Sequence, residues 1–253
     1  MSSNADPMAN SVWTRPPRSR GAQPTLSRDQ IVRAAIELLD EKGLDGLSMR
    51  RLGSRLAAGA TSLYWYVATK DELLELVVDE IMGEIEVPEV EAADWRTAAA
   101  AIAHGMRGMI LRHPWVTGLF GVRPNMGPNA MRMSDRVVGM LTAAGFTGVP
   151  VAYASSLLLS HAIGSATTEA AWRRSIAPSG KTADEVIDEM RPYIDEVAAQ
   201  YPNYGAWWQE NRTINVNEMQ DDNFAFGVER LLDGLQSWLD RRDAGDRHDA
   251  GRP

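Results

Sequence analysis

The chain of 253 residues contains no cysteine and four scattered histidines, His104, His113, His161 and His248. Without cysteine there is neither a disulfide framework nor thiolate metal chemistry. No apolar run approaches the roughly 18 residues of a membrane-spanning helix, because serines, His161 and Gly164 interrupt the most apolar region, 149–168. We therefore expect a soluble, cytoplasmic protein with no metal site and no cofactor.

Enzyme signatures are also missing. The sequence has no glycine-rich phosphate loop, no Gly-x-Ser-x-Gly elbow and no His-Glu-x-x-His pair. Strand-like alternation of apolar and polar residues is absent as well, whereas helical periodicity recurs along the chain. The sequence predicts an all-α protein that is not an enzyme and has no catalytic residues.

Charge is distributed unevenly along the chain. The net charge is −8, yet residues 1–70 carry ten Lys/Arg against six Asp/Glu, while residues 71–253 carry sixteen against twenty-eight. A basic front end on an acidic remainder is typical of a protein whose N-terminal part meets phosphate.

Four regions follow from these patterns. We expect a disordered basic arm at 1–24, a three-helix helix-turn-helix domain at 25–70, a larger helical bundle at 71–241 and a flexible tail at 242–253.

Capping signals and apolar spacing define the expected helices. Ser27 with Gln30, Thr69 with Glu72, and Thr182 with Glu185 form candidate capping boxes, and Pro192 should kink or break the helix that contains it. The helices are expected at about 27–42, 49–56, 60–66, 70–86, 95–112, 128–144, 150–174, 182–200 and 223–240. The charged face of helix 70–86 is expected to comprise Asp71, Glu75, Asp79 and Glu80.

Two short helices joined by a corner at Ala57-Ala58-Gly59 indicate a DNA-reading helix-turn-helix. The second helix offers the short hydroxyls of Thr61 and Ser62 for base edges, and Tyr64, Tyr66 and Lys70 follow as candidate phosphate contacts. A buried helical hairpin without DNA function would show the same corner. We interpret Leu63 and Trp65 as core residues.

Three segments closely resemble the DNA-binding domain of the tetracycline-repressor (TetR) family: 38–52 (LLDEKGLDGLSMRRL), 62–67 (SLYWYV) and 70–74 (KDELL). The resemblance covers about residues 25–82. It implies a homodimeric transcriptional repressor that binds double-stranded operator DNA and is released by a small-molecule effector. By this resemblance the base-facing positions are Arg50, Ala60, Thr61 and Ser62, the phosphate-facing positions are Ser48, Tyr64, Tyr66 and Lys70, and Arg51 is a weaker candidate.

A second similarity covers about residues 93–240. The runs Gly121-Val122-Arg123-Pro124 and Ala143-Ala144-Gly145-Phe146 look like the C-terminal domain of the tetracycline-repressor branch. Leu119 stands where that repressor has a magnesium-binding histidine, so a tetracycline–magnesium chelate is not the expected effector.

Large adaptable side chains are concentrated in the middle of the chain, and such residues line apolar ligand pockets. A packed helical core would use the same residues, and His161 also suits a hydrogen-bonded core position. The candidate contacts for an unknown, largely apolar effector are Met106, Met109, Ile110, Leu119, Phe120, His161 and Trp172. A helical small-molecule-binding protein without DNA function is the alternative reading of the whole chain. A dimer interface is expected from helices 150–174 and 223–240.

Overall fold

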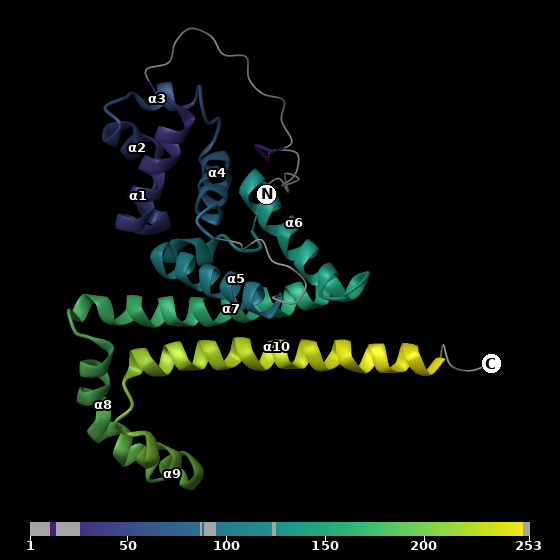
Figure 1. Ribbon diagram of the computed structural model, residues 1–253. Coiled ribbons are helices and arrows are strands. Elements are labelled where there is room, and N and C mark those ends of the chain that lie inside the picture. Colours follow the sequence, from purple (N-terminus) through teal and green to yellow (C-terminus); the bar gives the residue numbers. More distant parts are fainter. Residues whose placement is uncertain (1–10, 14–25, 87, 89–94, 123–124, 250–253) are drawn as a thin grey trace, which may run out of the picture. The chain divides into compact units, whose positions relative to one another are not determined.

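The computed structural model describes residues 11–13, 26–86, 88, 95–122 and 125–249. Every regular element in these ranges is a helix (Figure 1), which confirms the all-α prediction. The chain divides into two compact units between Leu159 and Ser160, and helix α7 contributes residues to both.

The first three helices form the N-terminal domain. They are α1 (Arg28–Gly46), α2 (Met49–Arg55) and α3 (Ala60–Leu63). The Ser27–Gln30 capping box is confirmed, since each side chain accepts a hydrogen bond from the other residue's backbone N–H. At Gly43 the backbone of α1 leaves helical geometry with a φ of 66°, a conformation that costs glycine little. The glycine expected to stop this helix therefore marks the kink near its end.

The rest of the first unit begins with α4 (Lys70–Met82). It continues with α5 (Trp95–Arg112), the 3₁₀ turn η2 (Pro114–Gly118), α6 (Pro128–Ala143) and the start of α7 (Val149–Ile176). The apolar faces of α4 and α5 supply fully buried core residues, including Leu73, Val77, Met109 and Ile110. Helix α4 contacts both α1 and α6, so it connects the N-terminal domain to the helices that follow.

The second unit contains the end of α7, the 3₁₀ turn η3, and three further helices. They are η3 (Ala177–Ser179), α8 (Ala183–Ala198), α9 (Pro202–Asn211) and α10 (Val216–Asp249). The Thr182–Glu185 capping box is confirmed, and α8 runs continuously through Pro192. Helix α9 was not anticipated, and α10 begins seven residues earlier than expected and extends into the segment expected to be a flexible tail.

Helix α7 is the most apolar helix in the described residues. The stretch 149–179 is long enough to cross a membrane and has a mean hydropathy of 1.2 in its best window, although sequence reasoning treated it as interrupted. One such helix is weak evidence for a membrane span, since core helices of soluble proteins meet the same criterion.

Candidate functional site

The corner between α2 and α3 depends on one unusual backbone conformation. Ala57 has a φ of 50°, in the left-handed region that costs a residue with a Cβ roughly 1–2 kcal/mol. Gly59 caps α3 with extended backbone instead. The chain thus turns sharply within a few residues and presents α3 as a separate short helix.

Helix α3 and the turn after it have one side buried in the core and one side exposed to solvent. Leu63 and Val67 have no exposed surface, whereas Thr61 and Ser62 are exposed. The core interpretation is confirmed for Leu63 but wrong for Trp65, whose exposed fraction is 80%. Only one helical turn separates the buried Leu63 from Val67, so Trp65 between them must point away from the core.

Among the remaining predicted DNA contacts, some are exposed and others already hydrogen-bond within the domain. Arg50 is exposed, as a base-reading residue requires, and Ala60 begins α3. The guanidinium of Arg51, by contrast, donates to the carbonyl of Gly46 at 2.5 Å. Arg51 therefore holds the end of α1, consistent with its weaker candidacy.

Two further candidates have structural partners as well. The Ser48 hydroxyl accepts from the Arg51 N–H at 3.2 Å and so caps α2. Lys70 Nζ lies 3.3 Å from the carbonyl oxygen of Leu44. An ammonium has three donors, so this contact leaves Lys70 able to reach a phosphate. Tyr64 is exposed and Tyr66 is half-buried.

Helix α4 carries buried carboxylates where sequence reasoning expected a charged outer face. Asp71 and Glu80 are exposed as expected, but Glu75 and Asp79 are each only 4% exposed, and Glu72 is 7% exposed. Glu72 Oε2 accepts from the Ala68 N–H at 2.9 Å rather than from the backbone of Thr69, its capping partner. A carboxylate buried this deeply needs hydrogen-bond donors.

Asp79 finds its donors on α6. Its carboxylate accepts from the backbone N–H groups of Asn129 and Ala130 at 3.1 and 3.0 Å, and the Asn129 side-chain amide donates to the Asp79 carbonyl at 3.0 Å. Helix α6 follows Gly127 and has no side-chain cap of its own. Asp79 thus caps α6 from a different helix, with its negative charge at the positive end of the α6 dipole.

Glu75 finds donors on the N-terminal segment. The Ser11 hydroxyl donates to Glu75 Oε2 at 2.7 Å, and the Val12 N–H donates to the same oxygen at 3.0 Å. Trp13 lies so close to Gly127 that a Cβ there would come within 2.6 Å of its ring. These three residues belong to the segment expected to be a disordered arm, whose other residues lie outside the described ranges.

A polar cluster ties α1 to the end of α5. The buried His113 lies between two carboxylates, with Nδ1 2.7 Å from Asp40 Oδ1 and Nε2 3.1 Å from Glu84 Oε1. The Trp115 indole donates to Asp40 at 2.7 Å, and Arg112 donates to Glu84 at 2.7 Å. The cluster therefore links the end of α5 and the segment just after α4 to α1.

The predicted effector contacts are spread over both units. Met106, Met109 and Ile110 are buried in α5, and Leu119 and Phe120 are half-buried beyond η2. In the second unit His161 stacks on Phe224 with ring centroids 5.4 Å apart, and Trp172 is half-buried. Each of these environments fits a packed core as well as a ligand contact.

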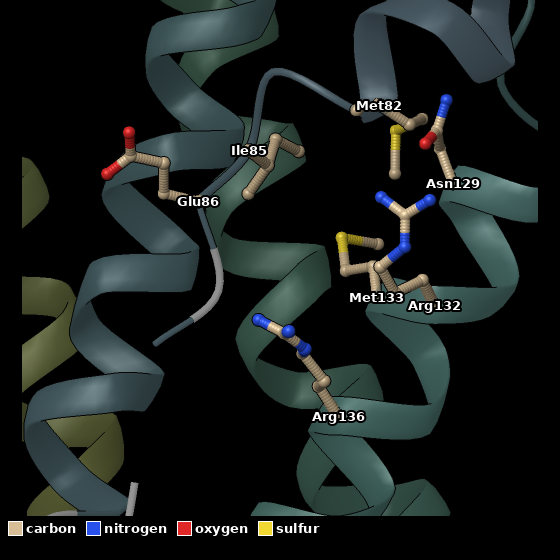
Figure 2. A pocket seen from close by; sticks show the side chains of 8 residues that line it. Met82, Ile85, Glu86, Asn129, Arg132, Met133 and Arg136 are labelled. Carbon is tan, nitrogen blue, oxygen red and sulfur yellow. The ribbon is translucent and has the colours of Figure 1, made fainter. Parts of the chain in front are cut away.

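A cavity of about 240 Å³ lies between the end of α4 and α6. It is lined by Met82, Gly83, Ile85, Glu86, Asn129, Arg132, Met133 and Arg136 (Figure 2). None of these residues is among the candidate effector contacts predicted from the sequence, although Met133 is one of the methionines concentrated in the middle of the chain. The spacing of Asn129, Arg132, Met133 and Arg136 on one helical face is the signal that could have shown them together.

Comparisons with known proteins agree over both halves of the chain. Residues 31–77 match the family described as bacterial regulatory proteins, tetR family, and residues 87–239 match the tetracyclin repressor-like C-terminal domain. An HTH-type transcriptional regulator of Saccharopolyspora erythraea is 38% identical over 208 residues, which cover 82% of this chain and 88% of that protein. The HTH-type transcriptional repressor DrrR1 of Streptomyces coeruleorubidus is 32% identical over 227 residues, 88% of this chain and 82% of that protein.

Solved structures show the same fold. Apo ActR from Streptomyces coelicolor has a TM-score of 0.72 and 30% identity, covering 87% of this chain and all of that one. ActR in complex with actinorhodin has a TM-score of 0.71 at 30% identity, covering 85% and 99%.

Proposed function

This chain belongs to the TetR family of bacterial regulatory proteins, and we propose that it works as a homodimeric repressor that a small-molecule effector releases from operator DNA. The chain is a helix-turn-helix transcriptional regulator, so a helical ligand-binding protein without DNA function is no longer the competing reading. We further propose that it acts in the cytoplasm, without a cofactor and without enzymatic activity, because its relatives are named as transcriptional regulators.

The observation that carries this proposal is that α3 exposes one side to solvent while buried side chains hold its other side in the core. We propose that Arg50, Ala60, Thr61 and Ser62 face bases, while Ser48, Tyr64, Tyr66 and Lys70 face phosphates and Arg51 contributes little. A single short helix buries too little surface to select an operator. Two copies about 34–36 Å apart, one turn of DNA, would suffice.

We propose that the dimer forms through exposed faces of α7 and α10. Leu157 on α7 is 48% exposed and Phe226 on α10 is 63% exposed. Leu232 and Leu235, which form the apolar stripe of the last helix, are buried within the single chain, so glutamate there would disturb the fold itself. Leu157→Glu with Phe226→Glu is the sharper test, and a stable wild-type monomer in sedimentation at micromolar concentration would contradict the dimer.

We propose that release acts through α4. A ligand that shifts α6 would pull on Asp79, and a shift near the end of α5 would act on α1 through His113. A ligand changes DNA affinity only if it prefers one arrangement of these helices, and such coupling is typically about 5–150-fold. The residues proposed for effector contact remain Met106, Met109, Ile110, Leu119, Phe120, His161 and Trp172, together with the cavity beside α6. ActR, which has been solved in complex with actinorhodin, supports the proposal that this chain binds a small-molecule effector.

A gel-shift assay with the DNA flanking the chain's own gene tests the function. Wild-type protein should retard this fragment in the presence of competitor DNA. Thr61→Glu should abolish the shift, because it places a carboxylate at the exposed DNA face. Thr142→Glu, the same change at an exposed position of α6, is the matched control and should bind like wild type. Equal binding by both variants would contradict the assignment of α3.

A further inference from the structure

The buried His113 has a carboxylate at each side of its ring. Nδ1 lies 2.7 Å from Asp40 Oδ1 on α1, and Nε2 lies 3.1 Å from Glu84 Oε1 in the segment just after α4. An ionised carboxylate can only accept hydrogen bonds, whereas a neutral imidazole has a single N–H donor. Both contacts are therefore hydrogen bonds at the same time only when both ring nitrogens carry protons and His113 is an imidazolium.

The charges around His113 balance only with that second proton. Arg112 donates to Glu84 Oε2 through Nε at 3.1 Å and Nη2 at 2.7 Å, so Glu84 already has a cation. The further donor to Asp40 is the neutral indole of Trp115, at 2.7 Å, and no lysine or arginine among the described residues forms an ion pair with Asp40. A neutral ring would leave two partly buried carboxylates with one cation, which is the less favourable arrangement. The charged side chains that face the ring or lie beside its partners are Asp40, Glu84, Arg112, Glu37 and Glu80.

The contact with Asp40 bears on the helix-turn-helix through α1. On this helix Glu37 and Glu41 pair with Arg55 at the end of α2, at 3.1 and 2.6 Å. These pairs tie α2 to α1, and α2 contacts α3 in turn. Asp40 lies in the same turn of α1 and pairs instead with the histidine that follows α5. Holding Asp40 therefore holds the group of helices that presents α3.

We propose that His113, as the imidazolium, is a positioning residue for DNA binding, so that operator affinity depends on its second proton. When that proton leaves, one of the two carboxylates faces a ring nitrogen that no longer donates, and the link between α1 and the segment after α4 weakens. A looser link lets α3 adopt more orientations, and ordering them again costs affinity. Histidine readily changes its charge near neutral pH, so affinity should fall as the pH rises. This dependence needs no effector and goes beyond the proposed release mechanism.

Operator affinity as a function of pH tests the inference on the full chain. Fluorescence anisotropy at constant ionic strength would use the DNA fragment that wild-type protein retards in the gel-shift assay. We expect wild-type affinity to fall about tenfold or more between about pH 6 and about pH 9, because one charge-assisted hydrogen bond is lost. His113→Gln should lack this fall, because glutamine has no proton to lose. His104→Gln, the same change at an exposed histidine of α5, is the matched control and should follow the wild-type profile.

Asp40→Asn guards against misfolding of the His113 variant. Asparagine keeps the shape of the side chain and removes its charge, and its amide can donate to a neutral ring nitrogen. This variant should therefore also bind DNA with little dependence on pH. If wild-type affinity does not fall with rising pH, or if both variants follow the wild-type profile, the inference is wrong.

Nitrogen NMR of the protein without DNA measures the charge of the ring directly. In the chain labelled with ¹⁵N-histidine, the ring signals that disappear in His113→Gln belong to His113. Both of its nitrogens should carry protons at about pH 7, and a ring with a single protonated nitrogen at that pH would overturn the inference. A chain that retards no DNA would contradict the proposed function, while the NMR result would still decide the charge of His113, so the two failures are distinguishable.

Discussion

Helices α3 and α4 are neighbours in the chain and place their polar side chains in opposite environments. Thr61 and Ser62 of α3 are exposed, and Trp65, just beyond it, is exposed too. Glu75 and Asp79 of α4 are buried and accept hydrogen bonds from segments outside the three-helix domain. The exposed side chains of α3 are available to contact DNA, whereas the buried carboxylates of α4 connect the domain to the rest of the chain.

Because the carboxylates of α4 are buried, their hydrogen bonds matter for the stability and position of the helix. A buried carboxylate that loses its donors costs far more than an exposed one, so each contact fixes the helix at one point. Glu72 ties its start to Ala68, Glu75 ties its middle to Val12, and Asp79 ties its end to Ala130. A rigidly tied helix transmits displacement instead of absorbing it.

The largest expected effect is a difference in stability between a variant on the buried side of the α3 region and a variant on its exposed side. Leu63→Ala should lower the free energy of unfolding by about 2–5 kcal/mol, because it empties a fully buried position. Trp65→Ala should change stability by less than about 0.5 kcal/mol, because its ring is 80% exposed. Urea denaturation of both variants measures the difference, and equal losses would mean that α3 has no distinct outer face.

Helix α4 should respond next most strongly. Asp79→Ala removes the cap of α6 and leaves two N–H groups without their acceptor, at a cost of about 1–3 kcal/mol. Glu80→Ala, at the exposed neighbouring position, is the control and should be close to neutral. If the two variants melted at the same temperature, Asp79 would not be the cap that its distances to Asn129 and Ala130 indicate.

The sequence was sufficient for the helices and caps of the N-terminal domain and insufficient for the burial of the α4 carboxylates. Caps such as Ser27 with Gln30 are local, so their geometry follows from neighbouring residues. The burial of Asp79 depends on α6, about fifty residues away, and no local pattern reveals that partner. Trp65 was misread for a related reason, since aromatic residues are usually buried and its exposure follows from the tight turn that brings both Leu63 and Val67 into the core.

The effector region was harder still. Its methionines were correctly noted as adaptable, but composition does not distinguish a packed core from a cavity. Met109 is fully buried in α5, while Met133, not among the predicted contacts, lines the cavity. Which methionine meets open space depends on how α4 and α6 approach each other, a property of packing rather than of either helix.

Substitutions of the exposed residues should affect DNA binding differently, according to whether each residue contacts a base or a phosphate. Arg50→Ala should cost roughly 1–3 kcal/mol of operator affinity and relax preference at one base pair if Arg50 reads a guanine. Lys70→Ala and Tyr64→Phe should weaken binding to all DNA about equally, and Lys70→Ala should also reduce the salt dependence. Gel shifts on single-base operator variants measure both, and a uniform loss for Arg50→Ala would reassign that residue to the phosphate backbone.

The smallest expected effect concerns the segment that lies on α4. Ser11→Ala removes one of the hydrogen bonds to Glu75 and leaves the Val12 N–H in place, so it should lower the free energy of unfolding by about 1 kcal/mol. Ser175→Ala, at an exposed serine of α7, is the control and should cost no more than a few tenths of a kcal/mol. Chemical denaturation of the two variants at one pH compares them directly. Should they prove equally stable, the hydrogen bond of Ser11 to Glu75 would contribute nothing to stability, and the Val12 N–H alone would tie Glu75 to the N-terminal segment.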